Sequence, residues 1–296
     1  MPETIVLKGA DGLPYSKGLM AQSLSASGLA PDRAYEVART LEARLGERAE
    51  AAIAVEELRE LAAAVVREEE GDDAARRFLA WEGLDRLERP LIVMLGGAPG
   101  VGKSTLATLL AGRVGVTRVV ATDAIRQVIR AFFSHDFMPV VHYSSFEAGQ
   151  TVDPDEVGEG DADIVGYLRQ VASVRTGVAA IAERAIQEGT PTILEGVHLV
   201  PGSLGDDVGS RCALVEAVVA IEDEDAHRSH FSLRGGDRPA LRYLRRFDQI
   251  RKLQGHLVER ARSRGVPVID ATNLDAGVAE AMELIRRRVA DELSGA

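Results

Sequence analysis

The segment GGAPGVGKST, residues 96–105, restricts the fold of this chain more than any other, and it directly follows the apolar run LIVML. Within it, Gly97, Gly102, Lys103 and Ser104 match the spacing G-x-x-x-x-G-K-[ST]. Glycines at such positions let backbone N–H groups turn inward around an anion, and a helix that begins beside them adds its positive end. The segment therefore predicts a phosphate-binding loop between a buried strand and a helix.

The residue types of this loop predict ATP and Mg²⁺ as its ligands. Lys103 would reach the β and γ phosphates, and the Ser104 hydroxyl would ligate the metal ion. The alternative is a glycine-rich turn that matches by chance, but the flanking strand and helix patterns argue against it. No N-K-x-D segment for reading guanine occurs, which favours a small-molecule or end-group kinase. The predicted nucleotide-binding residues of the loop are Gly97, Ala98, Pro99, Gly100, Val101, Gly102, Lys103, Ser104 and Thr105.

Short aliphatic runs alternate with helical patterns after residue 88, which predicts an α/β fold with a parallel sheet. The strand runs are residues 91–95, 117–121, 191–195, 214–220 and 266–270, and the helix candidates are 103–114, 123–133, 164–188, 238–264 and 275–293. With a phosphate loop after the first strand, we expect a P-loop NTPase of the adenylate-kinase-like type. Its five-stranded parallel sheet would have the order 2-3-1-4-5 and would bind ligands beyond the C-terminal ends of the strands.

Residues 1–88 have apolar residues at helical spacing and predict a small, mostly helical module, which leaves 89–296 for the P-loop domain. The segment TVDPDEVGEGDAD, residues 151–163, is rich in glycine and acid without periodicity, so we expect a mobile loop there.

Composition excludes several classes of protein. The formal net charge of −11 argues against a nucleic-acid partner, because such binding needs basic surface, although a small anionic substrate remains compatible. No apolar stretch approaches the length of a membrane span, and the N-terminus does not resemble a secretory signal. We therefore expect a cytoplasmic protein with no membrane partner. The single cysteine, Cys212, lies in an apolar run and is expected to be a buried structural thiol.

Asp123 and Arg126 stand just beyond the second predicted strand, one helical turn apart. A carboxylate there can accept the proton of an attacking hydroxyl and orient it for in-line displacement. Arg126 could hold an acidic group of the same acceptor bidentately. Polynucleotide kinases use the same D-x-x-R pairing. The alternative is helix capping, for which Thr122 and Asp123 are both suitable.

Four segments together resemble archaeal-type 2-phosphoglycerate kinase: HYSSFEAG (142–149), ILEGVHLVPG (193–202), HRSHFSLR (227–234) and PVIDATN (267–273). In addition, VLKGADGLPYSKGLMAQSL (6–24) is similar to the ATP-cone module that precedes the kinase in that family, so the resemblance covers nearly the whole chain. It implies phosphoryl transfer from ATP to the free hydroxyl of 2-phosphoglycerate, giving 2,3-bisphosphoglycerate. Candidates for holding the acceptor's anions are Arg126, His142, Ser144 and Ser145. For the two serines, a loop-capping pair is the alternative.

Glu195 and His198 follow the third predicted strand and would point toward the reaction centre. Glu195 is expected to border the substrate and to hold Mg²⁺ through water. His198 is expected to contact the acceptor, or else to serve as a hydrogen-bonding residue of the turn.

A kinase needs a lid that excludes water, and HRSHFSLRGGDRP has basic residues around a glycine pair. Arg234 or Arg238 could act there as an internal arginine finger, and we prefer Arg234, leaving Arg228 open. The competing interpretation is a basic helix face that pairs with the preceding EDED. Asn273, after the fifth strand, would lie near the adenine or cap a helix together with Asp275.

In ATP cones a hairpin and helices bind a regulatory nucleotide, and Lys8 and Lys17 have suitable places for phosphate. The segment KGADGLPYSKG departs from the usual basic run, so a structural or dimerising module is equally compatible and a homodimer stays open. The main hypothesis is an ATP- and Mg²⁺-dependent kinase for a small phosphorylated hydroxy acid. The alternatives are a kinase for another phosphorylated small molecule, such as an inositol phosphate, and a nucleotide-binding sensor with vestigial turnover.

Overall fold

The computed structural model describes residues 4–8, 11–48, 50, 52–82, 87–157, 160–233 and 237–294. The chain divides into two compact units: Met1–Glu88 with Arg113–Gly115 and Arg286–Ala296, and Arg89–Gly112 with Val116–Ile285. The boundary expected at residue 88 stays a prediction, because the end of the C-terminal helix groups with the N-terminal unit. No helix in the described part of the chain is long and apolar enough to cross a membrane.

The N-terminal unit is mostly helical, as expected, with a small sheet of order β2-β1-β3 among its described residues. β1 pairs antiparallel with β2 and parallel with β3. Its core contains Leu24, Leu41 and Phe78, all fully buried. The elements are β1 (Ile5–Lys8), β2 (Asp11–Pro14), α1 (Lys17–Ala26), α2 (Pro31–Gly46), β3 (Ala52–Ala54), α3 (Val55–Glu70) and α4 (Asp72–Glu82).

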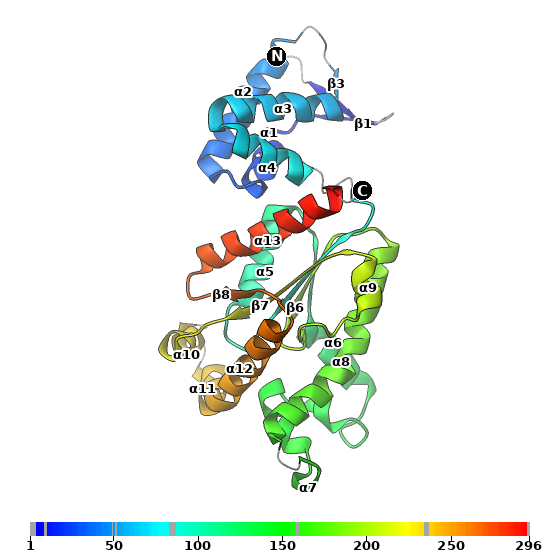
Figure 1. Ribbon diagram of the computed structural model, residues 1–296, viewed down its shortest axis with the longest axis vertical. Coiled ribbons are helices and arrows are strands. Elements are labelled where there is room, and N and C mark those ends of the chain that lie inside the picture. Colours follow the sequence, from blue (N-terminus) through cyan, green and yellow to red (C-terminus); the bar gives the residue numbers. More distant parts are fainter. Residues whose placement is uncertain are drawn as a thin grey trace. The chain divides into compact units, whose positions relative to one another are not determined.

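The second unit is built on a sheet that, within the described residues, has five strands in the order β5-β6-β4-β7-β8, all parallel (Figure 1). The strands are β4 (Leu91–Gly96), β5 (Arg118–Ala121), β6 (Thr192–Gly196), β7 (Ala213–Ala220) and β8 (Val268–Asp270). Numbered within the unit, this is the predicted order 2-3-1-4-5, which is confirmed. Every residue of β4 is buried, as a central strand covered on both faces requires.

The helices of this unit connect the strands. They are α5 (Lys103–Val114), α6 (Thr122–Phe132), the short 3₁₀ helices η2 (Pro139–His142) and η3 (Ser145–Thr151), α7 (Pro154–Val157), α8 (Ala162–Gln187), α9 (Asp206–Ser210), α10 (Glu224–Leu233), α11 (Asp237–Arg245), α12 (Phe247–Ser263) and α13 (Leu274–Ser294). Crossover connections between parallel strands are right-handed. The direction in which the chain steps across the sheet therefore decides which face of the sheet the connecting helix covers. From β4 to β5 the chain moves toward the edge of the sheet formed by β5. From β5 to β6 and from β7 to β8 it moves in the opposite direction, toward the edge formed by β8. Consequently α8 and α12 share one face, where they contact each other, and α5 covers the opposite face (Figure 1).

Two expectations from the sequence need correction. The helix predicted over 238–264 is divided into α11 and α12 at Arg246, whose backbone leaves the helical region at φ −116° and ψ 23°. The segment 151–163 is not simply a loop, because it includes the one-turn helix α7 and Asp161, which caps α8. The Asp161 carboxylate accepts from the Asp163 N–H at 2.9 Å and pairs with Lys252 Nζ at 2.9 Å.

Candidate active site

The phosphate-binding loop runs from the end of β4 to the start of α5. Its glycines Gly97, Gly100 and Gly102 all have positive φ, which L side chains rarely adopt. At Gly100 a Cβ would also lie 2.2 Å from Cζ of Phe231, so only glycine lets α10 approach so closely. Ala98 and Val101 are fully buried and anchor the loop by packing. Glycine backbone geometry and buried packing therefore both favour this conformation of the loop.

Two histidines of α10 fasten that helix to the loop. His227 Nε2 lies 2.9 Å from the Pro99 carbonyl oxygen and His230 Nδ1 lies 3.2 Å from that of Gly100. Because a carbonyl only accepts, each of these ring nitrogens carries the proton. Burial lowers the pKa of His227 to about 4, so its ring is neutral near pH 7. No local sequence pattern indicates this contact.

Lys103, Ser104 and Thr105 begin helix α5. Lys103 Nζ donates to the Ala98 carbonyl oxygen at 3.2 Å, which folds the side chain back over the loop. Ser104 Oγ donates to Glu195 Oε1 at 3.0 Å, and Thr105 is exposed. Glu195 reaches this position because β6 lies beside β4, with Glu195 opposite Leu95 in the register.

The Ser104–Glu195 pair suits a magnesium ion. A hydroxyl and a carboxylate are hard oxygen donors, and Mg²⁺ in phosphoryl-transfer sites takes few protein ligands and completes its shell with phosphate and water oxygens. Within the described residues no group of three or more His, Cys, Asp or Glu side chains gathers as a dedicated metal centre. These two residues are the pair predicted to hold the metal.

Asp123 and Arg126 lie on the first turn of α6. Arg126 Nε donates to Asp123 Oδ1 at 3.2 Å, and Nη1 donates to the carbonyl oxygens of Val141 and Tyr143 at 2.9 and 3.1 Å. Two of the three guanidinium nitrogens are thus committed, which leaves Nη2 for a ligand and restricts the bidentate grip expected from the sequence. The Asp123 side chain is 68% exposed and forms no cap, since no side chain caps α6. The structure therefore does not show the alternative in which Thr122 or Asp123 caps α6.

One cavity of about 150 Å³ joins the nucleotide loop to the acceptor side. Its lining residues are Pro99, Gly100, Lys103, Ser104, Asp123, Arg126, Ser144, Ser145, Phe146, Val197 and Tyr243. The side-chain hydroxyls of Ser144 and Ser145 have no hydrogen-bond partner among the described residues, and Ser144 makes no side-chain cap. Two hydroxyls and a guanidinium nitrogen thus face one space without a protein partner there, as an anion-binding wall requires.

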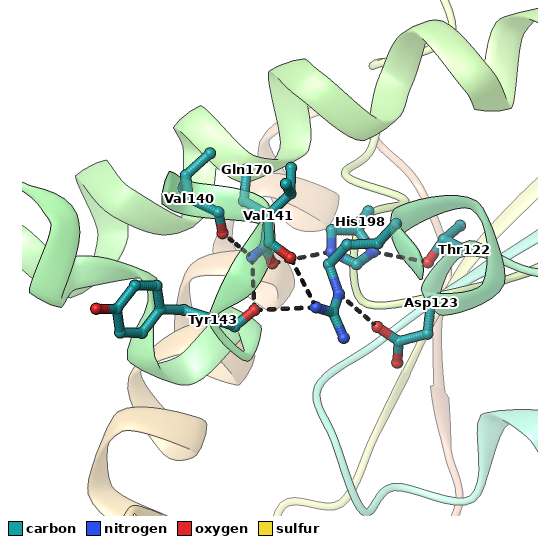
Figure 2. A network of polar contacts seen from close by, with 8 residues as sticks. Thr122, Asp123, Val140, Val141, Tyr143, Gln170 and His198 are labelled. Carbon is teal, nitrogen blue, oxygen red and sulfur yellow. Dashed lines mark hydrogen bonds and ion pairs between the residues drawn. The ribbon is translucent and has the colours of Figure 1, made fainter. Parts of the chain in front are cut away.

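The structure separates His198 and His142 from this wall. His198 is 1% exposed, and its Nδ1 and Nε2 lie 2.8 Å from Thr122 Oγ1 and 3.0 Å from Gln170 Oε1 (Figure 2). Burial lowers the pKa of His198 to about 4, so the ring is neutral. His142 Nε2 donates to the Phe133 carbonyl oxygen at 2.9 Å, and neither histidine is among the residues that line the cavity. Their predicted acceptor contacts stay predictions.

Gln170 is a buried polar residue next to the site that the sequence analysis did not single out. It lies on α8 in the same stripe as Tyr167, Val174 and Val178, all buried. A polar residue on the apolar stripe of a helix is the signal that would have found it, because a buried amide must have partners.

The remaining predicted residues belong to the segment predicted to form a lid, to the turn after β8 and to the N-terminal unit. Arg234 lies outside the described residues, and the side chain of Arg238 is not described either. Arg228 stacks over the Phe247 ring at 4.1 Å. Asn273 Oδ1 accepts from the Ala276 N–H at 3.0 Å and so caps α13, which leaves its place near the adenine a prediction. In the N-terminal unit, Lys17 pairs with Glu42 at 2.8 Å; the Lys8 side chain is not described.

A cavity that joins a phosphate loop to an exposed carboxylate suits transfer of a phosphoryl group to a small acceptor, and a protein built in this way is a P-loop kinase. No protein-family model matches the chain. Among its relatives are the 2-phosphoglycerate kinases of Methanothermobacter thermautotrophicus, Thermococcus kodakarensis and Methanocaldococcus jannaschii, which are 35%, 37% and 34% identical to it. The alignments cover 88%, 90% and 96% of this chain and 86%, 90% and 92% of those proteins. The chain belongs to the 2-phosphoglycerate kinase family, and it is an ATP-dependent small-molecule kinase.

Two solved kinases are similar in a looser way. A gluconokinase from Sinorhizobium meliloti 1021 is 17% identical with a TM-score of 0.41, covering 68% of this chain and 95% of its own. A shikimate kinase from Bacteroides thetaiotaomicron is 15% identical with a TM-score of 0.39, covering 66% and 97%. These values are too low to bear on the site.

Proposed function

We propose that this kinase transfers the γ-phosphoryl group of ATP to the free hydroxyl of 2-phosphoglycerate, giving 2,3-bisphosphoglycerate and ADP. The observation that carries the proposal is the single cavity lined by Lys103 and Ser104 on one side and by Asp123, Arg126 and the serine pair on the other. Relatives that bear the name 2-phosphoglycerate kinase and align over most of this chain support this choice of acceptor.

The acceptor carries a phosphate, a carboxylate and one free hydroxyl, and each has a complementary group on the cavity wall. Nη2 of Arg126 and the hydroxyls of Ser144 and Ser145 donate to the anionic groups. Asp123 is the exposed carboxylate that accepts a hydroxyl proton. A neutral or strictly apolar acceptor would leave these donors and the carboxylate unpaired, at a cost in binding.

On the nucleotide side, the loop N–H groups and Lys103 would hold the phosphates of ATP, and Ser104 and Glu195 would hold Mg²⁺. When bound, the metal ion neutralises negative charge on the phosphate oxygens. Arg234 completes this proposal as the cation that covers the transferring group, and Asn273 borders the adenine.

The residues of the chain then account for the proton and the bonds. Asp123 takes the proton of the acceptor hydroxyl while the oxygen of that hydroxyl bonds to the γ phosphorus. At the same time the bond between the γ phosphorus and the oxygen that bridges it to the β phosphate breaks. Lys103 and Arg234 stabilise the charge that moves onto the leaving ADP.

The test is a coupled ADP-release assay with ATP and Mg²⁺ across 2-phosphoglycerate, 3-phosphoglycerate, inositol phosphates and a 5′-hydroxyl oligonucleotide. We expect acceleration over the ATPase background only with 2-phosphoglycerate, and a product whose two phosphates are distinguished by ³¹P NMR. Turnover with an inositol phosphate instead would replace the acceptor in this proposal. The absence of acceleration with every acceptor would favour the nucleotide sensor.

A further inference from the structure

Helix α8 places one fully buried amide, Gln170, behind the acceptor side of the cavity. Its Nε2 donates to the carbonyl oxygens of Val140 and Tyr143 at 2.6 and 3.0 Å, and its Oε1 lies 3.0 Å from His198 Nε2 (Figure 2). Because carbonyl oxygens only accept, the amide nitrogen must face them, and Oε1 must accept from His198. The orientation of the amide is therefore fixed by its partners.

The same logic fixes the imidazole. His198 donates from Nε2 to Gln170, so its Nδ1 accepts from the Thr122 hydroxyl at 2.8 Å. Thr122 comes close because residue 196 is glycine: a Cβ on Gly196 would lie 1.8 Å from Thr122 Oγ1. A chain of buried hydrogen bonds thus runs from Gln170 to the residue directly before Asp123.

The other end of the amide holds the loop that contacts Arg126. Tyr143 O accepts from Gln170 Nε2 and also from Arg126 Nη1, at 3.0 and 3.1 Å. Tyr143 is followed directly by Ser144 and Ser145, which line the cavity. One side chain therefore fixes the backbone that orients the guanidinium and presents both serine hydroxyls.

We propose that Gln170, with His198 as its anchor, is a positioning residue that sets Asp123, Arg126 and the serine pair at the spacing the acceptor requires. The inference rests on the proposed function, in which those residues hold the acceptor. Gln170 is not among the described residues that line the cavity, so it acts only through its neighbours. Displacements of about 1 Å in such groups are enough to lower turnover by up to a hundredfold.

The chain offers a matched control, because Gln254 on α12 is a second buried glutamine that holds backbone. Its amide bonds the N–H and C=O of Ile221 at 3.3 and 2.8 Å, and it does not line the acceptor cavity. The variants Gln170→Met and Gln254→Met each replace a buried amide side chain by an apolar side chain of nearly the same size. We expect both to lose thermal stability, but only Gln170→Met to raise the acceptor KM by about tenfold or more with the KM for ATP within about twofold. Parallel changes in the two variants would reduce Gln170 to a structural role.

A second pair of variants covers the case in which Gln170→Met does not fold. Thr122→Val keeps the shape of the side chain but removes the hydroxyl that His198 accepts from, whereas Thr122→Ser keeps it. We expect Thr122→Val to raise the acceptor KM by about fivefold or more and Thr122→Ser to restore it to within about twofold of the wild type. An acceptor KM unchanged in Thr122→Val would overturn the anchoring by His198.

A readout independent of turnover separates this inference from the proposed function. In Thr122→Val and Gln170→Met, amide hydrogen exchange should accelerate over residues 140–146 and stay at the wild-type rate over 97–104. If the wild-type enzyme turns over none of the acceptors, the proposed function fails, and the exchange pattern alone decides whether Gln170 holds the loop. Uniform acceleration over both segments would overturn the inference.

Discussion

Lowering the pH from 7 to 5 should destabilise this protein through His198, and the structure gives the size of the effect. The ring is buried with both nitrogens bonded to Thr122 and Gln170, and burial lowers its pKa to about 4 from the ordinary 6.5. Below pH 6.5 the unfolded chain binds a proton at this residue, whereas the folded chain does not until about pH 4. The stability that the neutral ring contributes is therefore complete above pH 6.5 and is lost as the pH falls toward 4.

The magnitude follows from the two pKa values. At pH 5 the unfolded histidine is almost fully protonated and the folded one is mostly neutral, so the free energy of unfolding falls by about 2 kcal/mol from this residue alone. Most carboxylates contribute little in this window because their ordinary pKa values lie below 5. Burial raises the pKa of Glu216, but this group is the same in the wild type and in the comparison variant, so its contribution cancels.

The assay is urea unfolding at pH 7, 6 and 5, followed by far-UV circular dichroism. Fluorescence would not serve, because the single tryptophan, Trp81, lies in the N-terminal unit. The comparison is His198→Gln, which cannot take up the proton and should lose about 2 kcal/mol less than the wild type between pH 7 and 5. Equal losses in the two proteins would refute the claim that His198 stays neutral in the fold. His227, which burial also keeps neutral, contributes equally to both and cancels.

Three substitutions test individual residues of the site. Asp123→Asn should lower kcat by about a hundredfold or more with little change in melting temperature, since the proposed role of its carboxylate is to accept the proton and it caps no helix; a loss of stability with normal turnover would contradict this role. Arg126→Ala should raise the acceptor KM by about tenfold while ATP affinity, measured by calorimetry, stays unchanged, and a weakened ATP affinity would put Arg126 on the wrong side of the site. Gly100→Ala should destabilise the protein by about 1–3 kcal/mol in urea unfolding, because the new Cβ would meet Phe231 at 2.2 Å and the backbone there has φ +87°. Wild-type stability in Gly100→Ala would show that α10 does not press on the loop.

Much of the fold could be predicted from local patterns. Each strand of the second sheet is an aliphatic run with a turn at its end, and the phosphate loop identifies which strand is central. The division of the region 238–264 could not be predicted in this way, because both halves have helical periodicity. The break lies at Arg246, directly before the buried Phe247.

The candidate site, too, could be predicted only in part. Ser104, Asp123 and Arg126 come after strands, and Glu195 lies near the C-terminal end of β6. The C-terminal ends of parallel strands meet at one edge of the sheet, so the proximity of these residues could be predicted. The role of His198 could not, because a histidine after a strand is compatible with facing either the ligand or the core. In the structure both ring nitrogens are bonded within the protein, to Thr122 and Gln170, and the acceptor contact stays a prediction.

The sequence by itself determined the phosphate loop and the parallel sheet, because these depend on residue types at fixed short spacings, and the resemblance of several longer segments indicated the family. The tertiary structure decided which polar groups are free to meet a substrate and which are already used. Gln170 and Thr122 lie 28 and 76 residues from His198 in the chain, and no local pattern specifies such partners. The pairing of β5 with β6 brings Thr122 close to His198, and α8, which contacts α6 and β6, brings Gln170 to the same ring. Buried donors and acceptors must form hydrogen bonds with one another, so these groups are used within the protein. Asp123, one nitrogen of Arg126 and the two serine hydroxyls belong instead to residues that line the cavity.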